Sequence, residues 1–229
     1  MVFTSLFIVI TLLLIIAEYF NIKDFVFILK PLLIPSLCLI YLTTSIKKSP
    51  WYLVALFFAF LSNVFLLYSD SQLLLYGILT FLIYRLISIY VIIRNGDTIY
   101  LLPIVLATIP FIFIFSYLIY IMVSPDNPSF YATIINDFII SIFCGIGLSN
   151  YVMNDNKQNS WLLISTLLFT FLVILFMFDK FYLSFQIFKP LSALVFSLAH
   201  YAFLMFMVET KNQTTIDFPS IDFDKFKSK

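Results

Sequence analysis

The chain has 229 residues, of which 62% are hydrophobic and only 11% are charged, with a formal net charge of +1. A soluble domain carries about 25% charged residues, so this chain has too few charges to cover a surface that faces water. The composition excludes a disordered protein and argues against a soluble enzyme. The near-neutral charge argues against a nucleic-acid partner. The solvent that fits this composition is a lipid bilayer.

A helix that crosses a bilayer core of about 30 Å needs roughly 20 apolar residues. Eight stretches meet this requirement, in chain order: Val2–Phe20, Phe25–Ile46, Trp51–Tyr68, Gln72–Ile93, Ile99–Val123, Phe130–Met153, Trp161–Phe178 and Gln186–Val208. The first is interpreted as a membrane helix, because no Lys or Arg precedes its apolar run and no small-residue cleavage site follows it. Short polar segments separate the stretches, and Asp179–Phe185 is the least clear of these loops.

The apolar runs are continuous rather than alternating, which argues against membrane strands. We therefore predict an all-α fold, a polytopic membrane helical bundle of about eight transmembrane helices over residues 1–208. A polar, loosely ordered tail is expected over residues 209–229. The sequence does not indicate an oligomeric state.

The distribution of Lys and Arg predicts the orientation of the bundle. With eight spans, one side carries Lys47, Lys48, Arg94, Lys157, Lys211, Lys225, Lys227 and Lys229. The other side has Lys23 and Lys180 in loops, with Lys30 and Lys189 just inside helix ends. Because basic residues are enriched in cytoplasmic loops, both termini are expected in the cytoplasm of a protein of the cell membrane.

Ionisable residues inside a membrane span are costly, so each is a functional candidate. Successive spans run in opposite directions, which places one group of polar residues in the same half of the bilayer. This group predicts a pocket that opens to one face, rimmed by Lys30, Asn63, Arg85, Asp137 and Asp179. Arg85 lies near mid-span and should pair with a carboxylate, Asp137 being the first choice. A structural ion pair and a clamp for substrate phosphate both fit such an arginine.

Other polar or small residues in the spans have structural interpretations. Glu18 and Lys189 are close enough to helix ends to reach the headgroups. His200 is interpreted as a packing residue, and Gly145 and Gly147 as points of close helix contact. The two cysteines form no metal spacing, and the chain lacks HExxH, GxSxG and P-loop motifs. No metal and no cofactor are therefore predicted.

Several positions carry a family resemblance across roughly residues 25–208. Lys30-Pro31 opens the second span, Gly77 and Phe81 stand four apart in the fourth, Asp179 closes the seventh and Tyr201 lies in the last. In their order and spacing these residues resemble the lysoplasmalogenase (YhhN-like) family of eight-span membrane proteins. The resemblance implies hydrolysis of the vinyl-ether bond of lysoplasmalogens, with a membrane lipid or lysophospholipid as the partner.

The chain departs from the family pattern at functional positions. Ser62-Asn63 stands where Gly-Asp is expected, Arg85 where His is expected and Leu204 where Gln is expected. Vinyl-ether hydrolysis needs an acid to protonate the substrate and a base to guide water. An amide at position 63 can orient water, but it cannot exchange a proton at neutral pH.

The resemblance, with these departures, implies a set of roles. Asp179 would be the retained catalytic carboxylate, Asn63 would orient water or headgroup, and Asp137 would tune Arg85 or supply the second acid. Lys30 and Arg85 would hold phosphate, and Tyr201 would contact substrate. Three hypotheses stay open: such a hydrolase, a catalytically degenerate relative that binds lipid or a membrane partner, and a small transporter.

Overall fold

The computed structural model describes residues 2–68, 70–95, 100–183 and 185–216, with the backbone alone over 211–216. These residues form helices and turns, and no strand occurs among them. The elements are α1 (Val2–Tyr19), α2 (Lys23–Thr44), α3 (Pro50–Phe65), α4 (Ser71–Asn95), α5 (Leu101–Met122), α6 (Phe130–Met153), α7 (Lys157–Met177), the π-helix η1 (Phe178–Tyr182) and α8 (Phe188–Ile216). The prediction of an all-α membrane bundle is confirmed.

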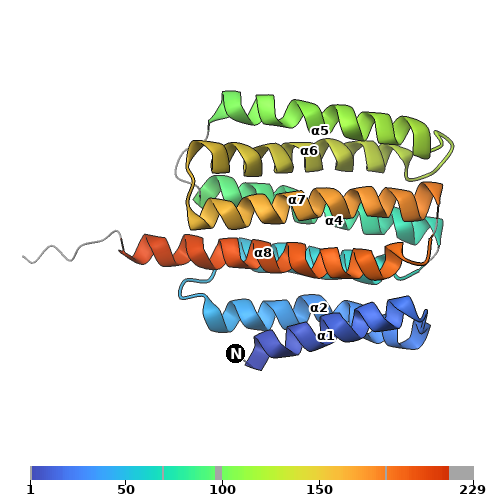
Figure 1. Ribbon diagram of the computed structural model, residues 1–229, viewed down its shortest axis with the longest axis horizontal. Helices are drawn as coiled ribbons and strands as arrows, with labels where there is room; N and C mark the ends of the chain where they lie inside the picture. The colour runs from blue at the N-terminus through green and yellow to red at the C-terminus, as the bar shows by residue number, and fades with distance from the viewer. Residues whose placement is uncertain (1, 69, 96–99, 184, 217–229) are drawn as a thin grey trace, which may run out of the picture.

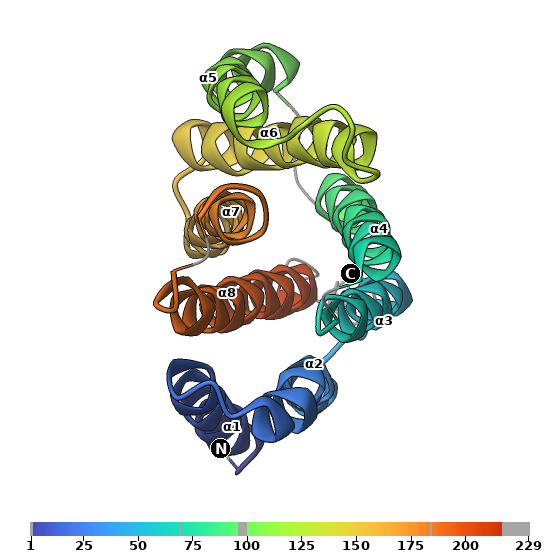
Figure 2. The same ribbon diagram turned by 90° about the vertical axis from the view of Figure 1, so that its right-hand side faces the viewer.

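Successive helices run antiparallel and form a layered stack (Figures 1 and 2). From one side to the other the order is α5, then α6, then α7 with α4, then α8 with α3, and finally α1 with α2. In the stack, α8 packs against α7, α1 and α2, while α6 joins α5 to α4 and α7. The start of α1 and the end of α8 lie together at one end of the bundle, here named the termini end (Figure 1).

Seven of the helices in the described part of the chain are long and apolar enough to cross a bilayer. The exception is α3, whose 16 residues span only about 24 Å at 1.5 Å per residue. Its expected C-terminal turn is missing because the chain tightens after Phe65. There, Leu67 N–H bonds to the Val64 carbonyl at 3.2 Å and Tyr68 N–H to the Phe65 carbonyl at 3.3 Å.

Two boundaries near α7 differ from the prediction for local reasons. The helix begins at Lys157 rather than at Trp161, because the Asn156 side chain accepts a hydrogen bond of 2.8 Å from Asn159 N–H and caps the helix. At the other end, the expected loop begins as η1. The Leu183 N–H bonds to the carbonyl of Phe178 at 2.8 Å, which is the wider repeat of a π-helix.

The predicted end of the last helix at Val208 is wrong, because α8 continues to Ile216. Its extension is held by an ion pair of 2.6 Å between Glu209 Oε1 and Lys157 Nζ of α7. Thr210 Oγ1 also donates to the Phe206 carbonyl at 2.7 Å. Residues 209–216 therefore belong to the helix, and the remainder of the expected tail, 217–229, lies outside the described residues.

Close helix contacts surround α6. A Cβ added to Gly145 would lie 3.1 Å from the Ile104 carbonyl oxygen of α5, and one added to Gly147 would lie 2.9 Å from Thr166 Cγ2 of α7. Small residues let membrane helices approach each other in this way. The interpretation of both glycines as packing points is confirmed.

Candidate functional site

A cavity of about 380 Å³ lies at the end of the bundle opposite the termini end, here named the cavity end. Seven helices and η1 contribute to it through the last turns of odd-numbered helices and the first half of even-numbered ones. Much of its wall is apolar and includes Leu14, Leu33, Phe27, Phe81, Phe176 and Phe196. Its ionisable residues are Glu18, Lys23, Lys30, Arg85, Asp179, Lys180 and Lys189.

Four of the residues predicted to form the site line this cavity: Lys30, Asn63, Arg85 and Asp179. Antiparallel helices explain the convergence, because the late part of one span lies beside the early part of the next. Asp137 and Tyr201 are not among the lining residues.

Lys30 and Asn63 form the part of the wall made by α2 and α3. The Asn63 amide Nδ2 donates to the Lys30 carbonyl at 2.9 Å, which ties the two helices together. Lys30 Nζ lies 3.7 Å from Glu18 Oε1 of α1. Glu18 was expected to reach the headgroups, but it is buried (7% exposed) and turned toward the lysine.

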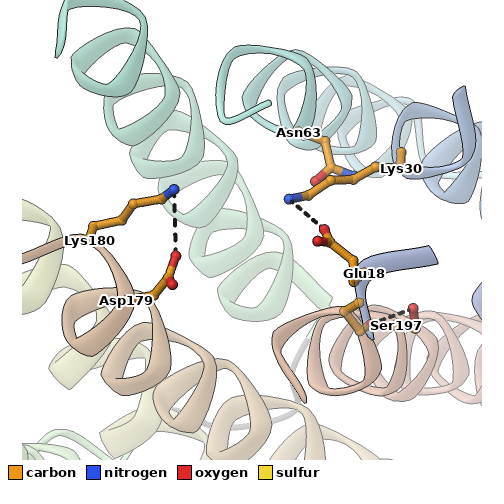
Figure 3. Close-up of polar contacts among 7 residues, drawn as sticks. Glu18, Lys30, Asn63, Asp179, Lys180 and Ser197 are labelled. Carbon is orange, nitrogen blue, oxygen red and sulfur yellow. Dashed lines mark hydrogen bonds and ion pairs between the residues drawn. The ribbon is translucent and has the colours of Figure 1, made fainter. Parts of the chain in front are cut away.

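Asp179 and Lys180 form the opposite part of the wall on η1. Asp179 Oδ2 is 3.5 Å from Lys180 Nζ. The other oxygen, Oδ1, is buried without a hydrogen-bond partner among the described residues. Figure 3 shows the Lys180 and Lys30 side chains pointing toward each other, each with a carboxylate beside it. π-Helical turns often occur at functional sites, and here the turn carries both charged residues.

Arg85 of α4 is fully buried at the cavity wall (0% exposed). Its Nη1 donates to Asn136 Oδ1 of α6 at 2.5 Å, and its guanidinium carbon lies 4.5 Å from the centre of the Phe81 ring. This is the geometry of a cation–π contact, which stabilises a positive charge. Nε and Nη2 have no hydrogen-bond partner among the described residues.

The expected direct pairing of Arg85 with Asp137 is replaced by an indirect one. The ion pairs of the described residues, within 4.0 Å, do not include these two side chains. Asn136 Nδ2 instead bridges to Asp137 Oδ1 at 3.3 Å. Successive residues of a helix point about 100° apart, so Asn136 meets the guanidinium and Asp137 (1% exposed) is buried beside it.

His200 and Tyr201 of α8 are not among the residues that line the cavity. Tyr201 stacks on Phe7 of α1, with ring centres 6.0 Å apart. The His200 ring packs against Phe169 and Phe196, at 4.8 Å and 4.1 Å between centres, and its Nδ1 lies 3.0 Å from the Phe196 carbonyl. These contacts agree with a packing role for His200.

Sequence reasoning did not select Lys180, Lys189, Lys23 or Asn136 for the site. Lys180 directly follows Asp179, and that adjacency was the available signal. Asn136 directly precedes the selected Asp137 in the sequence. A search of the described residues finds no group of three or more His, Cys, Asp and Glu placed to hold a metal ion.

Comparison with protein-family models gives a match to the YhhN family over residues 25–207. The chain belongs to the YhhN family. No curated protein and no solved structure matches it. The YhhN segment contains Lys30, Asn63, Arg85 and Asp179, whereas Glu18 precedes it.

The cavity of this YhhN protein is both apolar and electropositive. Five basic and two acidic side chains line it, a surplus of three positive charges. Its volume falls at the lower end of the range for small-molecule sites, roughly 300–1,000 Å³. Such a site can hold an anionic headgroup against the lysines while its leucines and phenylalanines contact a hydrocarbon chain.

Proposed function

We propose that this YhhN protein is a lysoplasmalogenase-type hydrolase of the vinyl-ether bond of lysoplasmalogen. The observation that carries the proposal is a carboxylate, Asp179, on the wall of an electropositive, apolar cavity inside a membrane bundle. A lysoplasmalogen has the matching parts: a phosphate, a polar glycerol and an apolar alkenyl chain. The reacting bond lies between glycerol and chain, that is, between the parts of the lipid that match the polar and the apolar lining.

The reaction consumes one water molecule. It also needs a group that donates a proton to the substrate and later accepts a proton from the water. A proton adds to the alkenyl carbon that is β to the ether oxygen, and the α carbon becomes an oxocarbenium ion. Water adds to that carbon and loses a proton. The resulting hemiacetal breaks its carbon–oxygen bond to the glycerol, and the products are an aldehyde and a glycerophospho compound with a free hydroxyl.

Asp179 can serve as acid and base in sequence. In its protonated form it donates to the alkenyl carbon, and the carboxylate left behind accepts the proton from the attacking water. Lys180 Nζ, 3.5 Å from Asp179 Oδ2, stabilises that carboxylate. A single carboxylate can then carry out both proton transfers. This mechanism does not need the second carboxylate that the family pattern places at position 63, where this chain has Asn63.

Asn63 is proposed to orient the attacking water. Its Nδ2 is committed to the Lys30 carbonyl, which leaves Oδ1 to accept a hydrogen bond from water. Lys30 is proposed to hold the phosphate. Arg85, fixed by Asn136, is proposed to contribute positive charge at the cavity wall. Asp137 is proposed to position that pair rather than to touch substrate.

The direct test is aldehyde release from lysoplasmalogen by the purified protein in detergent or proteoliposomes. Asp179→Asn should lower turnover by at least about 100-fold, the usual scale for loss of an acid–base group. Asp70→Asn is the matched control, because Asp70 caps α4 through its Oδ1 and an asparagine oxygen can do the same. The absence of turnover on any vinyl- or alkyl-ether lysolipid would refute the proposal.

A second candidate is a catalytically degenerate relative that binds lipid without cleaving it. The observation that favours it is Asn63 itself, which acts as a hydrogen-bond donor to a backbone carbonyl, a role closed to an ionised aspartate. Tight lipid binding without product would support this candidate. Activity gained by Asn63→Asp together with Arg85→His would identify the chain as a hydrolase that lost its second acid.

A further inference from the structure

We infer that the cavity selects lysolipids whose headgroup is a terminal phosphate monoester over lysolipids with a zwitterionic headgroup, and that Lys30 and Lys180 hold this phosphate from two sides. The inference deepens the proposed function, since it takes the cavity as a lysolipid site. It rests on how the charges of the cavity are arranged.

The two lysines come from opposite walls, α2 and η1, and their ammonium groups face each other (Figure 3). Two ammonium groups that face each other repel, because each disfavours the charged form of the other. Their side chains keep 28% and 32% of their surface exposed. A doubly charged group between them would remove the repulsion and accept hydrogen bonds from both.

The carboxylates beside the lysines leave donors for such a ligand. The Lys30–Glu18 and Lys180–Asp179 distances are 3.7 Å and 3.5 Å, whereas a charge-assisted hydrogen bond measures about 2.7–2.9 Å. An ammonium has three N–H donors. Neither carboxylate occupies them fully at these distances.

The other basic residues of the lining add positive charge that no neighbouring carboxylate of the described residues pairs with. Lys23 and Lys189 line the cavity and form no ion pair within 4.0 Å with the described residues. Arg85 is fully buried at the cavity wall, and two of its guanidinium nitrogens have no hydrogen-bond partner among the described residues. A phosphate monoester offsets two of the three surplus charges. A phosphocholine offsets none, because it brings a cation with its phosphate.

The experiment measures binding of ether lysolipids that cannot be hydrolysed as vinyl ethers. The probes are an alkyl-ether lysophosphatidic acid, its phosphocholine counterpart, the alkylglycerol without a headgroup, and glycerophosphate without a chain. Each is titrated into the full-length purified protein in neutral detergent. We expect the monoester to bind at least about tenfold more tightly than the phosphocholine lipid at low salt, and added salt to narrow this difference.

Lys180→Gln and Lys30→Gln should each reduce the preference for the monoester. Lys47→Gln is the control, because Lys47 is exposed at the termini end, away from the cavity, and it should leave the preference unchanged. The salt titration on the unmodified protein tests the inference even where a lysine variant fails to fold.

Equal or tighter binding of the phosphocholine lipid would overturn the inference. Glycerophosphate binding as tightly as the full lipid would also overturn it, because the site would then take a soluble phosphate ester. Selective monoester binding with no vinyl-ether turnover would support the inference and reject the proposed hydrolase. Preferred hydrolysis of choline lysoplasmalogen would do the reverse.

Discussion

At the scale of single residues, Arg85 poses the sharpest physical problem. A buried guanidinium without a charge partner is strongly destabilising. The contacts of Arg85 among the described residues are a hydrogen bond to the neutral Asn136 and the aromatic face of Phe81. Asp137, joined to Asn136 by a hydrogen bond, is the nearby carboxyl group that can offset the positive charge. The three residues therefore stabilise a cation jointly, across the α4–α6 contact.

This arrangement predicts that Asn136→Leu lowers stability by about 1.5–3 kcal/mol, the range for hydrogen bonds to charged groups. Thermal unfolding in detergent measures the loss. The double variant Arg85→Met/Asn136→Leu should recover part of it, because the buried cation that lacked an acceptor is gone. Strictly additive losses would contradict coupling between the two side chains.

The residues of the site were predictable in part. Lys30, Asn63 and Asp179 were found because alternating span direction alone places them in one half of the bilayer. The partner of Arg85 was not, since choosing between Asn136 and Asp137 requires the rotation of α6 about its axis. Lys180 was missed because a loop was expected where η1 turns it toward Lys30.

At the scale of helices, the contacts of α6 with α5 and α7 depend on missing side chains. A Cβ at Gly145 would meet the Thr108 side chain and come within 3.1 Å of two backbone atoms of α5. Backbone atoms cannot move without moving the helix. At Gly77 the nearest atoms, at 2.5 Å and 2.8 Å, belong to the Leu66 side chain, which can change rotamer.

Gly145→Ala should therefore destabilise the protein by about 1–3 kcal/mol, the usual cost of overpacking. Gly77→Ala should have the smaller effect, although its added Cβ would come closer to a neighbouring carbon atom than the one at Gly145. Unfolding temperatures of both variants, measured in the same detergent, test this order. A larger loss for Gly77→Ala would show that the α3–α4 contact is the more rigid one.

Helix existence was predictable because each apolar run must satisfy its backbone hydrogen bonds in lipid. The ends of the helices were less predictable, because each depends on contacts of individual side chains. Asn156 starts α7 before its first apolar residue, and the Lys157–Glu209 pair lengthens α8 past the apolar run. Composition alone does not contain these side-chain contacts.

At the scale of the whole molecule, an even number of antiparallel helices places both ends of the bundle's chain on one side (Figure 1). We propose that this side is cytoplasmic. The four lysines at the opposite end, which weaken the charge bias, are Lys23, Lys30, Lys180 and Lys189, and all of them line the cavity. Because these four lysines lie at the cavity, the bias toward basic residues in the remaining loops is stronger than a simple count implies.

Single cysteines test the orientation. In a background of Cys38→Ser and Cys144→Ala, a membrane-impermeant thiol reagent should label Lys23→Cys in intact cells. It should label Lys47→Cys only after permeabilisation, because the two exposed positions lie at opposite ends of α2. Labelling of both after permeabilisation controls for reactivity, and the reverse pattern would place the cavity toward the cytoplasm.

The outermost position of α5 has a consequence for how the protein enters the membrane. Only 17% of its most apolar segment is buried, against 67% for α6, and its mean hydropathy is 2.4 against 1.7. An aspartate such as Asp137 opposes insertion of a lone helix by up to about 3 kcal/mol. During synthesis, α6 should therefore leave the translocon most readily as a hairpin with α5. The helix that contributes least to the interior would then be the one that delivers the polar residues of α6, at and beside the cavity wall, into the bilayer.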